Sequence, residues 1–253
     1  MSAATIRAAG RSGSAGAHIQ TSRNRDPESS MSKPSSRERQ QLRQTELKAI
    51  ELLERYDCPM AYHAICTYFL GAMSSPKPVQ PMKVLAHLWD GALPVMPDLD
   101  AVNELLGALI HGLWNALTVH QEADRPYRLM KPPRRASRPS VAFIAKVREE
   151  ELDGFLHGIF GDGEDLQVPE PMAQALDNLM QMSGMFAGIC ELLADSSKPA
   201  SAADLQGLMD NIAKLTAIAE AEIHDVAMEA RMMREADGAM QRQQSSPRRT
   251  GLH

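Results

Sequence analysis

Apolar side chains recur at three- and four-residue steps along most of the chain, and this spacing is the feature that most restricts its fold. Such a repeat places side chains on one face of an α-helix, whereas a half-buried strand requires alternation. The clearest stretch covers residues 99–120, where polar and small residues fill the opposite face. Its apolar stripe contains Leu99, Val102, Leu105, Leu106, Leu109, Leu113, Trp114 and Leu117. We expect an amphipathic helix there.

The composition favours helices throughout. Hydrophobic residues make up 43% of the 253 residues and aromatic residues only 4%, so 16 methionines, with leucine and alanine, supply the apolar volume. These residues lose little side-chain freedom in a helix. We predict an all-α protein with a single bundle-like domain of about seven helices over residues 38–236. The basic N-terminal tail 1–37 and the polar tail 237–253 are predicted to be disordered, and Met31 is a second candidate start.

Glycine and proline mark the ends and starts of the predicted helices. The stretches "YFLGAMSSPKPVQPM" (68–82) and "GFLHGIFGDGEDLQVPEPM" (154–172) share a Phe-Leu pair, a glycine, a polar gap and a Pro-Met pair. Glycine permits the left-handed exit of a helix and proline suits a first turn, so Gly71 is predicted to end one helix and Pro81 to start the next. The two stretches carry different charged residues, which favours structural turns over a repeated active-site loop. Asp98 and Ser201 are predicted N-caps.

Charge and cysteine content restrict the class of protein. The formal net charge is −5, which gives no general attraction to nucleic acid or anionic lipid. Three cysteines, Cys58, Cys66 and Cys190, are too few for a disulfide framework, so a reducing, cytoplasmic location is expected. No apolar run reaches the roughly 18 residues of a membrane span. The sequence contains no phosphate-binding loop and no nucleophile elbow.

The order of motifs in residues 58–121 is similar to that of a known family. An apolar Phe-Leu helix, a loop with prolines, the short helix "MKVLAHLWD" and a long helix with Trp114-Asn115 come one after another. This order resembles the N-terminal half of the YecA/YgfB-like family of small bacterial helical proteins, and "ELDGFLHGIF" (151–160) resembles it again. The resemblance covers about residues 40–195 and implies a helical fold and a bacterial, cytoplasmic setting. Tyr68 departs from the usual glycine, and the family's cysteine-rich zinc-binding tail has no counterpart after Cys190.

Two groups of residues could support metal chemistry. Asp153 and His157 lie four residues apart, which places them on one helical face as a metal-ligand or acid–base pair, or as a surface ion pair. The loop 162–170 is acidic and could bind a cation or simply join two helices. Its acidic residues are Asp162, Glu164, Asp165 and Glu170. Together these groups would make a metal-dependent, hydrolase-like enzyme, although the loop does not match the calcium-binding EF-hand.

A Pro/Arg-rich linker at residues 123–139 is the strongest signal outside the expected core. It contains no acid after Asp124, and its prolines rule out a helix. Its basic residues are Arg125, Arg128, Lys131, Arg134, Arg135 and Arg138. They could contact an acidic protein partner or the phosphates of nucleic acid, or the segment could be a solvated linker. Tyr127 is the only aromatic residue of 125–138, which gives little support for base stacking.

Three further features have both a structural and a functional interpretation. His63 and Cys66 lie three residues apart on one helix, as a thiol–imidazole pair or as core residues. The methionines Met172, Met180, Met182 and Met185 could line a groove for a partner helix or fill the core. The apolar seam of residues 202–236 could form a homodimer, or pack within the chain over its first half and remain exposed over its second.

The sequence therefore predicts a non-catalytic, helical interaction or regulatory protein. No complete catalytic constellation is present, no cofactor is expected, and the partner is expected to be another protein. The metal-dependent enzyme using Asp153 and His157, and nucleic-acid binding through residues 125–138, are the alternatives.

Overall fold

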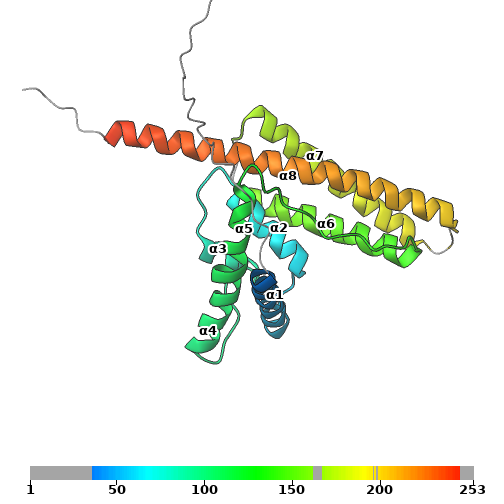
Figure 1. Cartoon of the computed structure of the whole chain (residues 1–253), viewed down its shortest axis with the longest axis horizontal. Coiled ribbons are helices and arrows are strands. Elements are labelled where there is room, and N and C mark those ends of the chain that lie inside the picture. The colour runs from blue at the N-terminus through cyan, green and yellow to red at the C-terminus, as the bar shows by residue number, and fades with distance from the viewer. Residues whose placement is uncertain (1–35, 162–166, 196, 198, 246–253) are drawn as a thin grey trace, which may run out of the picture.

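The computed structural model describes residues 36–161, 167–195, 197 and 199–245 (Figure 1). The helices in chain order are α1 (Ser36–Arg55), α2 (Tyr62–Met73), α3 (Pro81–His87), α4 (Leu99–Leu106), a π-helix (Gly107–Trp114), α5 (Asn115–Leu117), a 3-10 helix (Thr118–Gln121), α6 (Arg138–Phe160), α7 (Glu170–Ala194) and α8 (Ala202–Ser245). Residues 99–121 are helical without a break, so the described residues form seven helical segments and no strand. The predicted all-α class is confirmed. Within the described residues, no helix could cross a membrane.

The hydrophobic core has two parts, and α2 lies between them. One part gathers apolar side chains of α1, α2, α3 and the 99–121 segment, and the other gathers those of α6, α7 and α8. Consecutive residues of α2 divide between the parts, because Phe69 is buried in the first and Leu70 in the second. Figure 1 shows α6, α7 and α8 as one layer of long helices, with α1 and α4 projecting from it.

Glycines make the contact between α2 and α6 possible. A Cβ atom on Gly71 would lie 2.1 Å from the carbonyl oxygen of Phe155, and one on Gly158 would lie 2.1 Å from that of Tyr68. Only residues without a Cβ atom allow two helix backbones to approach so closely. The prediction that Gly71 ends its helix is wrong, because α2 continues to Met73 and Gly71 is a packing position within it.

Side-chain caps define several helix boundaries where the sequence predicted them. The Asp98 carboxylate accepts a hydrogen bond from the Ala101 N–H at 2.8 Å, at the start of α4. At the start of α8, the Asp204 N–H donates to the Ser201 hydroxyl at 3.1 Å and the Ser201 N–H donates to the Asp204 carboxylate at 2.9 Å. This reciprocal arrangement is a capping box. Gly161 ends α6 with a φ of +53°.

The middle of the 99–121 segment is a π-helix instead of the expected α-helix. Gly112 lies in it against α1, where a Cβ atom would meet the Thr45 methyl group at 2.5 Å. Three large side chains of this π-helix, Leu109, Leu113 and Trp114, are buried in the core. Periodicity alone does not distinguish such a segment from an α-helix.

Helix α8 is longer and more fully packed than predicted. It runs to Ser245, so the expected boundary at 236 is wrong; a single glycine, Gly238, costs only about 1 kcal/mol in a helix of otherwise good helix formers. The seam is buried within the chain far into its second half, at Leu205, Ile212, Ala219, Ile223, Val226 and Ala230. Arg234 then donates to the carbonyl oxygens of Met73 at 2.7 Å and Ser75 at 2.8 Å. A homodimer through residues 202–236 would therefore have to use another face.

Candidate functional site

The Pro/Arg-rich linker is an extended segment that runs alongside α6 and reaches its N-terminal end (Figure 1). We call residues 125–137 the strap. Its residue Leu129 is buried in the core part formed by α6, α7 and α8. The Ser137 hydroxyl accepts from the Ser140 N–H and forms the N-cap of α6, so the strap leads directly into that helix. The interpretation as a free, solvated linker does not fit these contacts.

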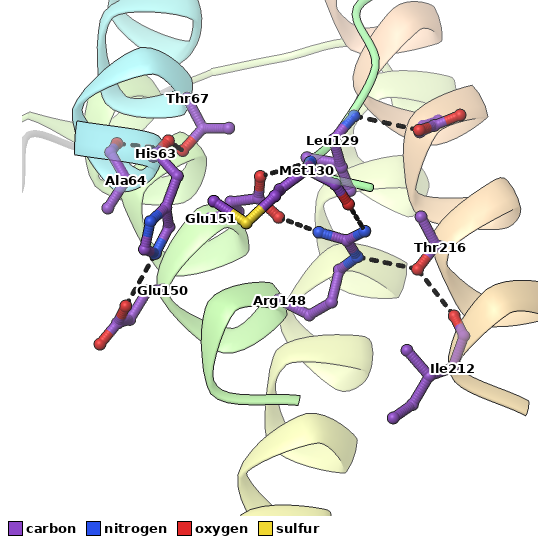
Figure 2. A network of polar contacts seen from close by, with 11 residues as sticks. His63, Ala64, Thr67, Leu129, Met130, Arg148, Glu150, Glu151, Ile212 and Thr216 are labelled. Carbon is purple, nitrogen blue, oxygen red and sulfur yellow. Dashed lines mark hydrogen bonds and ion pairs between the residues drawn. The ribbon is translucent and has the colours of Figure 1, made fainter. Parts of the chain in front are cut away.

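Hydrogen bonds from α6 and α8 hold the strap backbone in place (Figure 2). The Met130 N–H donates to the Glu151 carboxylate at 2.9 Å, and the Leu129 N–H donates to the Glu220 carboxylate at 3.0 Å. The Met130 carbonyl oxygen accepts from the Arg148 guanidinium. Two successive strap residues are thus fixed by two different helices.

A buried ion pair within α6 organises this anchor. The side chains of Arg148 and Glu151 lie one helical turn apart, are each 1% exposed and pair directly. Arg148 also donates through Nε to the Thr216 hydroxyl at 2.8 Å, which joins α6 to α8. All three guanidinium nitrogens therefore have a partner, as a buried charge requires.

The environment of Glu151 has opposing effects on its pKa. Burial raises the pKa of the Glu151 carboxyl, while the Arg148 guanidinium and the Met130 N–H act against that rise. The carboxylate is the form that accepts from both donors. Contacts with the strap, and not with solvent, therefore stabilise the Arg148–Glu151 ion pair.

The six basic residues of the linker have different surroundings. Arg125 pairs with Glu122 at 3.2 Å, and Arg128 pairs with Glu220 at 2.5 Å. Arg138 is the first residue of α6, and its guanidinium donates to the Leu193 carbonyl oxygen at 2.6 Å and to that of Asp195 at 3.2 Å, at the end of α7. Arg128 and Arg138 thus attach the linker to α8 and to the end of α7, whereas Arg125 pairs with a residue three positions before it.

The remaining three, Lys131, Arg134 and Arg135, are exposed and form no ion pair with a carboxylate in the described part of the chain. We call them the basic cluster. They lie on an anchored backbone, on either side of the rigid pair Pro132-Pro133. The structure therefore presents three positive charges at the end of the strap.

Tyr127, the aromatic residue of the strap, faces the interior. Its ring packs edge-on against His120 with 5.1 Å between the ring centroids, and it contacts both core parts. Burial raises the pKa of its hydroxyl well above the ordinary value, and the neighbouring Cys66 thiol adds to the rise. Tyr127 is not available to stack on a nucleic-acid base.

Asp153 and His157 line a second site, a pocket of about 360 Å³ between α2, α3 and α6. Glu150, His87 and Asp90 also line it. Asp153, however, accepts a hydrogen bond from the Ser183 hydroxyl of α7 at 2.5 Å, and the His157 ring lies 5.3 Å from the Tyr68 ring. Both side chains thus contribute to helix packing at the edge of the pocket.

Metal binding by these residues remains a hypothesis. The described residues contain no group of three His, Cys, Asp or Glu side chains placed to hold an ion. Residues Asp162, Glu164 and Asp165 of the acidic loop lie outside the described residues, and Glu170 is the first residue of α7. Asp153 and His157, which the sequence places on one helical face, thus line the same pocket, but the described residues supply no third ligand beside them.

The thiol–imidazole pair, the alternative to a core role for His63 and Cys66, does not form. His63 binds Glu150 of α6 at 2.8 Å. Burial raises the pKa of the Cys66 thiol to about 12, which keeps it protonated. The two residues serve the core and its boundary, as their alternative interpretation proposed.

The methionine set is divided between core and surface. Met172 and Met182 are buried, at 0% and 5% exposed, whereas Met180 and Met185 are 44% and 50% exposed. The core interpretation is confirmed for Met172 and Met182, and a groove lined by Met180 and Met185 stays a prediction.

Sequence reasoning did not identify Arg148, Glu151, Thr216 and Glu220 as the residues that hold the strap. One signal was present: Arg148 lies four residues after Ile144 and four before Leu152, on the apolar stripe of α6. A charged residue in such a position requires a buried partner.

Comparisons with known proteins do not identify this chain. No family model matches it, and no curated protein or solved structure shows significant similarity.

Proposed function

We propose that this protein is a non-catalytic helical interaction protein that binds an acidic surface of another protein through the basic cluster. The observation that carries the proposal is the contrast between a strap fixed by Glu151, Arg148 and Glu220 and three exposed basic side chains without described ion-pair partners. The proposal includes a cytoplasmic location and membership of the YecA/YgfB-like family, whose resemblance implies a helical fold.

A fixed strap favours binding because it reduces the entropy lost on association. Each flexible side chain or backbone segment that must be ordered at an interface lowers the affinity by an amount of order 1 kcal/mol. The backbone beside the cluster is already ordered through Leu129 and Met130, and Pro132-Pro133 restrict the backbone between Lys131 and Arg134. Only the three side chains then remain to be ordered.

A protein partner suits the cluster better than nucleic acid does. Non-specific nucleic-acid binding depends on many phosphate contacts and on aromatic side chains that stack on bases. The strap offers three unpaired cations, its tyrosine faces inward, and the whole chain carries a net charge of −5. A short acidic stretch of a protein requires no more than a local positive surface.

Co-purification with matched charge-reversal variants tests the proposal. The full-length tagged chain is compared with Lys131→Glu/Arg134→Glu/Arg135→Glu, and with a control that reverses the exposed residues Arg43, Lys83 and Lys214. Both variants change the net charge equally. We expect a defined partner to be retained by the wild type and the control and lost from the cluster variant. Retention of the same partners by the cluster variant, or recovery of none by the wild type, contradicts the proposal.

A further inference from the structure

An exposed aromatic side chain lies next to the basic cluster on the outer face of α6. The Ser140 hydroxyl donates to the Arg135 carbonyl oxygen at 2.6 Å, which fixes the end of the strap against the first turn of α6. Phe143 is one helical turn beyond Ser140 and is 53% exposed, although phenylalanine is usually buried. The fold thus places an apolar ring one helical turn from the point where the Arg135 end of the basic cluster meets α6.

The face of α6 changes character immediately after Phe143. Lys146 is exposed but engaged by Glu149 at 3.3 Å and Glu150 at 3.7 Å, and Asp153 lies one turn later. A partner that extends from the Arg135 end of the strap along α6 therefore meets an apolar ring and then the carboxylates of Glu149, Glu150 and Asp153. Lys131 lies at another level of α6, because its neighbour Met130 is bonded to Arg148 and Glu151.

From this pattern we infer that the partner presents an acidic segment that carries a large apolar side chain, which packs on Phe143 while the acidic residues contact Arg134 and Arg135 of the basic cluster. The inference rests on the proposed function and names the chemistry of its partner. Aromatic and basic residues in combination are typical of the strongest contacts in protein interfaces.

The charges beyond Phe143 favour a peptide over a single strand of nucleic acid. A nucleic-acid backbone carries a negative charge at every nucleotide, so a strand stacked on Phe143 would continue towards Glu149, Glu150 and Asp153. Like charges repel there. A peptide can confine its acidic residues to the part that faces the basic cluster.

Fluorescence anisotropy with defined probes tests this inference. Probe one is a fluorescein-labelled peptide of alternating glutamate and glycine with one tryptophan, probe two replaces the tryptophan with serine, and probe three is a labelled oligothymidine of equal charge. The proteins are the full-length wild type, Phe143→Ser, the cluster reversal, and Met185→Ser, which removes another large side chain that is 50% exposed.

We expect the wild type to bind probe one about tenfold more tightly than probe two, because the tryptophan removes the apolar ring from water. Phe143→Ser should abolish this preference without changing the affinity for probe two, and Met185→Ser should leave it unchanged. Cluster reversal should weaken both peptides. Far-UV circular dichroism checks that each variant is folded.

Several outcomes overturn the inference. They are equal binding of the two peptides by the wild type, a preference that survives Phe143→Ser, tighter binding of the oligothymidine, and the absence of peptide binding. The proposed function is judged separately by co-purification, so equal peptide binding together with a partner lost on cluster reversal removes the inference and leaves that function standing.

Discussion

The substitution Gly158→Ala tests whether the α2–α6 contact holds the two parts of the core together. The added Cβ atom would lie 2.1 Å from the Tyr68 carbonyl oxygen, 2.7 Å from the Ala72 nitrogen and 3.0 Å from the Gly71 carbonyl carbon. All three atoms belong to the backbone of α2. No side-chain rotation can relieve the overlap, so the helices must separate.

The distances set the size of the effect. Moving the closest contact from 2.1 Å to the 3.4 Å of an ordinary contact requires a displacement of about 1.3 Å. A gap of up to 1 Å already removes about a quarter to a half of each dispersion contact along the interface, and overpacking of cores costs about 1–3 kcal/mol where side chains can adjust. Backbone atoms adjust less, while alanine in place of glycine returns about 1 kcal/mol of helix propensity. We expect a net loss of about 3 kcal/mol.

Urea unfolding monitored by far-UV circular dichroism measures this loss, with Gly184→Ala as the matched control. Gly184 lies within α7, and a Cβ atom there would meet nothing within 4 Å. The same substitution should therefore stabilise the protein there by about 0.5–1 kcal/mol. A loss below about 1 kcal/mol for Gly158→Ala, or an equal loss at both positions, would refute the packing argument.

Three further predictions concern charge and the thiols. Glu151→Gln leaves Arg148 as a buried, unpaired cation and should destabilise the protein by about 3 kcal/mol in the same assay, with faster tryptic cleavage of the strap; unchanged stability and cleavage would contradict the anchoring role. Burial raises the pKa of the Cys66 thiol to about 12, so an alkylating reagent added to the folded protein should modify the part-exposed Cys190 well before Cys66. Mass spectrometry measures the two alkylation rates, and equal rates would contradict the burial of Cys66. Two basic side chains of α1, Lys48 and Arg55, lower the pKa of Glu104 below its ordinary value. Their pairing with Glu104 therefore stabilises the fold fully at a pH above that ordinary pKa, and the stabilisation is lost as the pH falls through the lower pKa of the folded protein. Acid titration of stability should therefore be flatter in Glu104→Gln, and identical curves would count against the ion pair.

Periodicity predicted the helices well because burial in this fold tracks helical faces. The seam of α8 is the clearest case, since Ile212, Ala219 and Ile223 are each at most 1% exposed. It failed at the start of α4, where Leu99 belongs to the apolar stripe but is 71% exposed. A stripe identifies the inward face of a helix, but not how far along the helix the packing continues.

The strap shows a second limit of sequence reasoning. Its composition correctly excluded a helix, and it identified the basic residues, but it could not divide them into anchoring and exposed ones. That division depends on Glu220, which lies 92 residues after Arg128, and on the carbonyl oxygens of Leu193 and Asp195, which accept from Arg138. Contacts between a side chain and a distant backbone leave no periodic trace in a sequence. Gly71 illustrates the same point, because a glycine that ends a helix and one that packs within it look alike until the partner helix is known.

The position of α2 between two cores has a consequence for how the molecule could be divided. A cut between Asp124 and Arg125 would leave the strap with the three long helices to which it is bonded, and would separate Leu70 from the core part in which it is buried. Each fragment would expose the apolar surface that the other fragment covers. The two surfaces fit closely because the glycines of α2 and α6 allow the two helix backbones to approach. Residues 36–124 and 125–245 should then reassemble when expressed together as separate chains, which would make this fold a natural starting point for a split reporter.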